Sequence, residues 1–106
     1  ALAPIKAAIL PLVKKDGLPE FAEQIVKKLR FDYNVVYEEK DSIGKRYRRM
    51  DAVGTPFCIT VDHDSLNDQS VTLRHRDTME QKRVHIDELA AIIDKEVNMK
   101  YLFEQL

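Results

Sequence analysis

The stretch from Pro56 to Arg76, PFCITVDHDSLNDQSVTLRHR, decides the fold because it holds two strand-like segments in close succession. Pro56–Asp62 is an apolar run of strand length, which is typical of a buried strand. Val71–Arg76 alternates apolar and polar side chains, which predicts a second strand that returns antiparallel to the first. The polar residues 63–70, HDSLNDQS, are too many for a tight turn and predict a hairpin-type loop.

Strand and helix patterns alternate on both sides of this hairpin. The sequence predicts strands at Ile5–Leu12 and Tyr33–Glu39, helices at Leu18–Phe31 and from Asp41 or Ser42 to Val53, a short fifth strand at Arg83–His85 and an amphipathic helix at Ile86–Val97. Strands joined through helices pair in parallel with right-handed crossovers, whereas a hairpin pairs antiparallel. The order β-α-β-α-β-β-β-α therefore predicts an α/β fold with a mixed sheet.

Composition limits both the fold and the function. The 106 residues, 44% of them hydrophobic, suffice for one domain with a core of its own. A net charge of −1 excludes a globally basic nucleic-acid binder, so any affinity for a polyanion has to come from local clusters of cations. The sequence shows neither an apolar run of membrane-span length nor a signal-peptide pattern. Because the chain starts at Ala1, directly before a strand-like segment, we expect it to be a domain of a longer protein.

Several kinds of chemistry lack their motifs. No glycine-rich phosphate loop follows the first strand, which argues against a small-molecule enzyme of the α/β class. The side chains that could bind metal are not spaced as zinc ligands, so we expect no metal site; they are Cys58, His63, His75 and His85. A single cysteine excludes an internal disulfide and fits a reducing compartment. We expect no catalytic residue in this chain.

Cations gather on one side of the predicted helix that contains Gly44–Arg49, GKRYRR. At 3.6 residues per turn, three cations lie on one face and three apolar side chains on the opposite face. The cations are Lys45, Arg48 and Arg49, with Arg46 at their border, and the apolar residues are Ile43, Tyr47 and Met50. The apolar face is expected to pack on the sheet. The basic face is either an ordinary solvated surface or part of a binding surface.

Arginines also line one side of the predicted returning strand. Alternation sends Arg74 and Arg76 to the side opposite the apolar residues, where we expect an open, cationic sheet face. An arginine fork can bind phosphate or the acceptor edge of a base, and it stacks on base rings. The alternative is that Arg74 and Arg76 only pair with nearby acids such as Asp77 or Glu80.

The segment KDSIGKRYRRMDAVGTPFCITVD, followed by VTLRHRDTMEQKRVHIDEL, resembles the C-terminal anticodon-binding domain of the homodimeric, class II glycyl-tRNA synthetases. The opening APIKAAILPLVKKDGLPEFA fits the first strand and helix of that domain. Among class II anticodon-binding domains, the block TLRHRDTMEQ is much closer to the glycine-specific branch. The resemblance covers nearly the whole chain. It implies that residues 1–106 are one anticodon-binding domain, a C-terminal fragment of a longer synthetase, with a five-stranded mixed sheet flanked by three helices.

The resemblance also implies a site. The domain would bind the anticodon stem-loop of a glycine tRNA, so that the parent enzyme can attach glycine in an ATP-dependent reaction. Lys45, Arg46, Arg48 and Arg49 would contact phosphates or the loop, Arg74 and Arg76 would lie on the sheet face that meets the bases, and Thr78, Glu80 and Gln81 would sit in the turn that follows. Glu80 would accept from a cytosine amine.

The remaining expectations concern the longer protein. The resemblance implies that ATP and magnesium bind in a catalytic domain outside this chain, that the parent enzyme is a homodimer, and that it works in the cytoplasm without a membrane partner. A non-catalytic accessory or dimerisation module of the same fold, as in the accessory subunit of mitochondrial DNA polymerase, stays open as the alternative.

Overall fold

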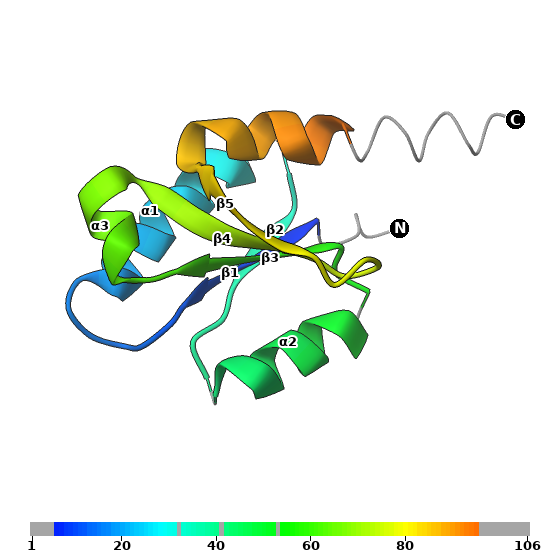
Figure 1. Cartoon of the computed structure of the whole chain (residues 1–106), viewed down its shortest axis with the longest axis horizontal. Helices are drawn as coiled ribbons and strands as arrows, with labels where there is room; N and C mark the ends of the chain where they lie inside the picture. Colours follow the sequence, from blue (N-terminus) through cyan, green and yellow to red (C-terminus); the bar gives the residue numbers. More distant parts are fainter. Residues whose placement is uncertain (1–5, 32, 41, 53, 96–106) are drawn as a thin grey trace, which may run out of the picture.

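A five-stranded mixed sheet forms the centre of the protein (Figure 1). The computed structural model describes residues 6–31, 33–40, 42–52 and 54–95. The strands are β1 (Ala7–Pro11), β2 (Val35–Tyr37), β3 (Phe57–Val61), β4 (Ser70–His75) and β5 (Gln81–His85), in the spatial order β2-β1-β3-β4-β5. β1 pairs in parallel with β2 and β3, and β4 pairs antiparallel with β3 and β5. The predicted α/β class and mixed sheet are confirmed.

Helices cover both faces of the sheet. They are α1 (Leu18–Arg30), α2 (Ile43–Ala52), α3 (His63–Asp68) and the 3₁₀ helix η1 (Ile86–Glu88), after which residues 89–95 continue as an α-helix. Figure 1 shows α1 and the helix after β5 on one side of the sheet and α2 on the other. We refer to these two sides as the α1 side and the α2 side.

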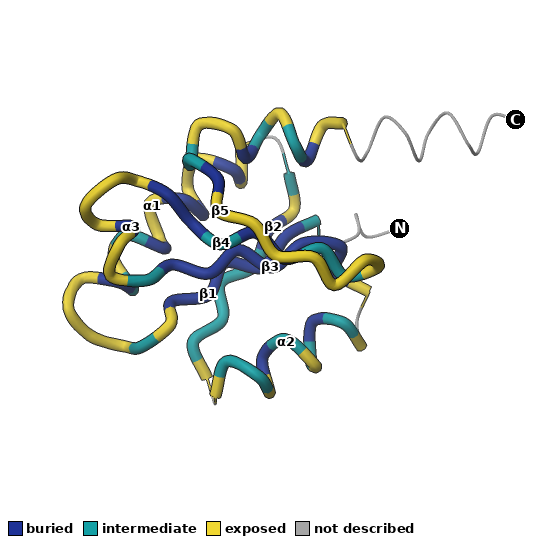
Figure 2. The backbone as a smooth tube through the Cα atoms, viewed as in Figure 1, coloured by how far each residue is buried: buried dark blue, intermediate teal, exposed yellow. Residues whose placement is uncertain are grey.

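Alternating side chains build a separate apolar core on each side. On the α1 side, Ile9 and Ile59 from neighbouring strands pack with Leu89 and Ile93 from the helix after β5. On the α2 side, a smaller cluster contains Ala8, Leu10, Met50 and Cys58. The central strands β1 and β3 are therefore buried on both faces, whereas most of β5 is exposed (Figure 2).

The predicted hairpin-type loop at residues 63–70 is wrong, because His63–Asp68 form the short helix α3. Asp62 is its N-cap: the carboxylate accepts from the Ser65 amide at 3.2 Å, and the Ser65 hydroxyl accepts from the Asp62 amide at 3.1 Å. This reciprocal pair is a capping box with serine in the place of the usual glutamate. Gln69, with a φ of 57°, ends the helix.

Most other predicted boundaries are close to the observed ones. β5 begins at Gln81 rather than Arg83, so it is longer than expected. Ser42 caps α2, since its hydroxyl accepts from the Lys45 amide at 3.4 Å. The predicted boundaries at Ile5, Asp41, Val53 and Val97 lie outside the described residues.

Arg46 ties α2 to the sheet, which corrects its predicted place on the solvent-facing border of the helix. The residue is only 2% exposed. Its Nη1 donates to the carbonyls of Pro11 at 2.6 Å and Glu38 at 3.1 Å, and its Nη2 donates to the carbonyl of Leu12 at 3.3 Å. These carbonyls lie at the ends of β1 and β2, where the sheet no longer supplies donors. Arg46 is thus a structural residue that faces the interior and cannot meet a phosphate from this position.

Replacing this buried guanidinium should weaken the fold. Arg46→Met keeps an unbranched apolar stem but removes the guanidinium group and with it the donors to three carbonyls, which we expect to lower the free energy of unfolding by about 1–3 kcal/mol. Urea titration followed by circular dichroism measures the loss. Arg48→Met, on the exposed side of the same helix, is the matched control and should change stability by less than about 0.5 kcal/mol. Equal effects of the two substitutions would contradict the anchoring role.

Asp62 should make the fold sensitive to acid. Its hydrogen bonds from Arg83 are the main reason that the pKa of this carboxyl lies below its ordinary value of 3.8. A lowered pKa in the folded state adds stability above pH 3.8 that is lost as the pH falls through the folded-state value.

The test uses Asp62→Asn, which retains a good N-cap without the charge. Its denaturation midpoint should fall less than that of the wild type between neutral pH and a pH below 3.8. Asp64→Asn is the control. It removes an acid of α3 that forms no ion pair within the described residues, so its denaturation midpoint should depend on pH as that of the wild type does. Parallel pH profiles for Asp62→Asn and the wild type would refute this account.

Candidate nucleic-acid interface

The structure divides the nine predicted site residues into three groups. Lys45, Arg48 and Arg49 lie on the outer side of α2; Arg76, Thr78, Glu80 and Gln81 lie at the β4–β5 hairpin; Arg46 and Arg74 are buried. The buried pair holds α2 on the sheet, and Arg76 lies near the end of the same helix, next to Gly54.

The outer side of α2 carries cations that are available to an outside anion. Lys45 and Arg48 are exposed, and within the described residues neither forms an ion pair. Arg49 is half-buried and lies 3.1 Å from the Glu38 carboxylate. The opposite side of α2 packs on the sheet through Ile43, Tyr47 and Met50, so the predicted apolar and basic faces of the helix are confirmed. Lys45 and Arg48 form the solvated part of the basic face.

Arg74 is not on an open face, which corrects the prediction from alternation. Its side chain is 8% exposed, and its two Nη atoms donate to the two carboxylate oxygens of Asp51 at 2.9 and 3.0 Å. The guanidinium carbon also lies 4.8 Å from the ring centroid of Tyr47. Alternation placed Arg74 on the correct side of the sheet, but α2 covers that side and supplies both partners.

Arg76 lies where the hairpin meets the end of α2. Its Nε donates to Asp77 at 3.2 Å, and its side chain is 34% exposed, so the predicted pairing with a nearby acid is present. Gly54 leaves room for it: a Cβ at Gly54 would lie 3.2 Å from Nη1 of Arg76. The φ of Gly54 is +82°, which disfavours any other residue there.

The turn between β4 and β5 is held by its own hydrogen bonds. The amide of His75 donates to the carbonyl of Glu80 at 3.0 Å, and the amide of Met79 donates to the carbonyl of His75 at 2.8 Å. The Thr78 hydroxyl accepts from the Glu80 amide at 3.2 Å. Thr78 therefore shapes the turn, while Glu80 remains exposed. Gln81 is not in the turn as predicted but is the first residue of β5, in register with Arg74 and hence on the α2 side.

Sequence reasoning missed Arg83, which lies with Thr72 and Gln81 on the surface between α2 and the sheet edge. We call this surface the β4–β5 shelf and define it as the α2-side residues Thr72, Gln81 and Arg83. Tyr47 of α2 reaches as far as Thr60 on β3, where the two hydroxyls lie 2.6 Å apart. Thr72 is the neighbour of Thr60 on β4 and pairs in turn with Arg83 on β5, so the shelf begins next to the part of the sheet that α2 covers. A prediction of β5 from Gln81 onward would have placed Gln81 and Arg83 on one face.

Arg83 lies on this shelf within a network of four hydrogen bonds. Nη1 and Nη2 donate to the carboxylate of Asp62 at 2.6 and 2.7 Å. Nε donates to the Ser70 hydroxyl at 2.7 Å, and Nη1 also donates to the Thr72 hydroxyl at 3.2 Å. The guanidinium group is thereby fixed in one orientation.

The remaining candidates for chemistry are the thiol of Cys58 and the potential metal ligands of the described residues. Burial raises the pKa of the Cys58 thiol to about 11, so it stays protonated, and the side chain belongs to the α2-side core. No group of three or more histidine, cysteine or acidic side chains that could hold a metal ion is found in the part of the chain that the structure describes. Nor is any described helix of a length and hydropathy that would let it span a membrane.

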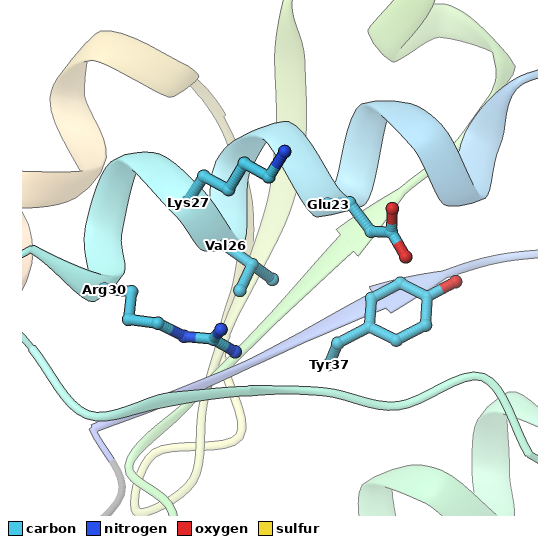
Figure 3. Close-up of a pocket in the computed structure, with 5 residues that line it drawn as sticks. All are labelled: Glu23, Val26, Lys27, Arg30 and Tyr37. Atoms are coloured by element: carbon cyan, nitrogen blue, oxygen red, sulfur yellow. The ribbon is translucent and has the colours of Figure 1, made fainter.

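A cavity of about 280 Å³ lies on the other side of the sheet, between α1 and β2 (Figure 3). It is lined by Glu23, Val26, Lys27, Arg30 and Tyr37, none of which belongs to the predicted site. Burial, followed by the hydrogen bond to Glu39, raises the pKa of Tyr37 well above its ordinary value. The phenol therefore stays protonated and donates to Glu39, and acidic and basic side chains both line the cavity.

Comparison with known proteins places the chain in a family. The model of the anticodon binding domain matches residues 6–96. The chain is 60% identical over 92 residues to a glycine–tRNA ligase of Rhodopirellula baltica and 60% identical over 95 residues to one of Clostridium perfringens. These alignments cover 87% and 90% of this chain but 17% and 20% of the relatives, so the chain spans about a fifth of their length.

Solved structures share the fold at low identity. The RNA binding domain of threonyl-tRNA synthetase from Cryptosporidium parvum superposes with a TM-score of 0.78 at 23% identity, covering 87% of this chain and 23% of that one. Prolyl-tRNA synthetase from the same organism gives a TM-score of 0.81 at 20% identity, covering 91% and 21%. The likeness to glycyl-tRNA synthetases predicted from the sequence is confirmed by the curated relatives, and the chain belongs to the family of anticodon binding domains.

Proposed function

We propose that this domain recognises the anticodon stem-loop of a glycine tRNA as part of a glycine–tRNA ligase. The observation that carries the proposal is a sheet face left open beside a basic helix. The β4–β5 shelf adjoins α2, whose outer side presents Lys45 and Arg48, neither of them in an ion pair among the described residues. An unpaired loop of RNA needs both parts, because its phosphates require cations and its splayed bases require a polar surface.

The chemistry of the hairpin suits cytosine. Glycine codons begin with GG, so the second and third letters of the anticodon pairing with them are both C. A cytosine edge offers an amine donor and two acceptors, N3 and O2. The exposed Glu80 carboxylate can accept from the amine, and the Gln81 amide can both donate and accept. Arg46 and Arg74 are not assigned RNA contacts, because both are buried and bonded to the protein's own groups. Substituting either one would therefore change folding.

The proposal extends to the longer protein. The curated relatives bear the name glycine–tRNA ligase, which favours a ligase over the accessory or dimerisation module. The aminoacylation reaction would use ATP and magnesium bound outside this chain. The parent enzyme would be a homodimer in the cytoplasm. This chain would contribute no reacting group, and its RNA contacts would orient the acceptor end of the tRNA in a distant site.

Binding to an RNA hairpin tests the proposed function. The 106-residue chain should bind a hairpin carrying a glycine anticodon and should bind more weakly when both anticodon cytosines are changed to uracil, because uracil lacks the amine donor. Fluorescence anisotropy measures both affinities, and each mismatched base is expected to cost about 1–3 kcal/mol. Equal affinity for the two hairpins, or for a fully paired duplex, would refute anticodon recognition.

The salt dependence of binding tests the role of α2. Lys45→Glu with Arg48→Glu should reduce the slope of log affinity against log salt by about 0.7 for each phosphate that the helix no longer neutralises. Lys27→Glu with Arg30→Glu is the matched control, since it reverses the same two residue types at the same spacing on α1. An equal change in slope for both double variants would mean that RNA is attracted by the overall charge rather than by α2.

A further inference from the structure

Arg83 has its N–H groups turned toward the protein. Its partners are Ser70 and Thr72 on β4 and Asp62 directly after β3. The side chain starts on β5, so the guanidinium group extends across β4 toward the end of β3 and lies along the sheet. Hydrogen bonding to Asp62 also raises the pKa of Arg83, so it stays charged while it is held there.

This arrangement determines what Arg83 can offer to a ligand. The five N–H bonds of a guanidinium group lie in one plane, and four hydrogen bonds of Arg83 are already made within the protein. Too few donors are left for a bidentate grip on phosphate. The side chain is nevertheless 34% exposed. Because most of its N–H edge is occupied, the part of the guanidinium group that a ligand can still engage is its flat face.

The surroundings suit a planar ligand. Gln81 is two residues away on the same strand and the same face, at about 7 Å along the strand, which places an amide beside a ring stacked on Arg83. Tyr47, whose hydroxyl lies 2.6 Å from that of Thr60 beside the shelf, has one face of its ring covered by Arg74 and packs against the α2-side core, so Arg83 is the better platform.

We propose that Arg83 is a stacking platform for an unpaired base of the bound RNA, and that Asp62 is the positioning residue that holds it flat. This inference rests on the proposed function and assigns an interaction within it. The expected ligand is a pyrimidine ring lying on the guanidinium face with its polar edge toward Gln81. Because each base has a π face, the platform contributes affinity, and the neighbouring polar side chains contribute selectivity.

The experiment uses the 106-residue chain and an RNA hairpin in which pyrrolocytosine, a fluorescent cytosine analogue, replaces one anticodon cytosine at a time. Stacking quenches the fluorescence of this analogue. In Arg83→Lys the charge remains but the flat group is removed, so we expect the quenching at one of the two positions to disappear and the affinity to fall roughly fivefold or more. The salt slope should stay the same, because the variant neutralises the same phosphates as the wild type.

Two further variants sharpen the result. Arg30→Lys makes the same replacement on the α1 side and should bind as the wild type does. Asp62→Asn keeps the N-cap and Arg83 but removes the charged partner, so it should weaken quenching at the same position as Arg83→Lys. This variant decides the question if Arg83→Lys proves poorly folded by circular dichroism.

The outcomes separate the inference from the proposed function. A wild-type chain that binds with cytosine preference, while Arg83→Lys and Asp62→Asn keep full quenching, overturns the platform and leaves the proposed function standing. Weaker binding by Arg83→Lys with quenching unchanged at both positions would mean that Arg83 contacts the RNA through its N–H edge, and would equally overturn the platform. A wild-type chain that shows no preference for the cytosines overturns both.

Discussion

The ion pair between Arg74 and Asp51 determines which part of the sheet is covered and which part is left open. Arg74 comes from β4 and Asp51 from the last turn of α2, and two hydrogen bonds of 2.9 and 3.0 Å join them with the guanidinium group almost fully buried. A buried charge needs a paired and hydrogen-bonded partner, so separating the two would be costly. The pair fixes the end of α2 over β4, and Arg46 fixes the beginning of the helix over the ends of β1 and β2. With the helix held at both ends, the shelf on β4 and β5 remains exposed.

Pairing within the chain also explains how a protein with a net charge of −1 can present a basic surface. Carboxylates partner the arginines that build the site: Asp51 binds Arg74, Asp62 binds Arg83, and Asp77 binds Arg76. These acids neutralise the structural cations and fix their orientation. On α2, the exposed residues Lys45 and Arg48 form no ion pair within the described residues and remain available to an outside polyanion. Local arrangement, and not total charge, produces the attraction.

Periodicity predicted the fold and the orientation of most side chains, but it could not predict what covers a face. The spacing of apolar residues was enough for α1, and the apolar run was enough for β3. Alternation placed Arg74 on the correct side of β4, yet its burial depends on Asp51, which lies 23 positions away and has no local signal. Arg46 is similar, because its partners are backbone carbonyls at the ends of two strands. The capping box of α3 could have been predicted from Asp62 and Ser65 if serine had been accepted in the place of glutamate.

The two outermost strands have a consequence for how the domain behaves in solution. A strand at the border of a sheet carries unpaired amides and carbonyls, which can recruit another chain and lead to aggregation. β2 has only three residues, and β5 has Lys82 and Arg83 at adjacent positions. Shortness and charge are two of the devices that prevent such edge-to-edge polymerisation. The domain can therefore leave a broad polar face uncovered for a partner while resisting self-assembly along its sheet.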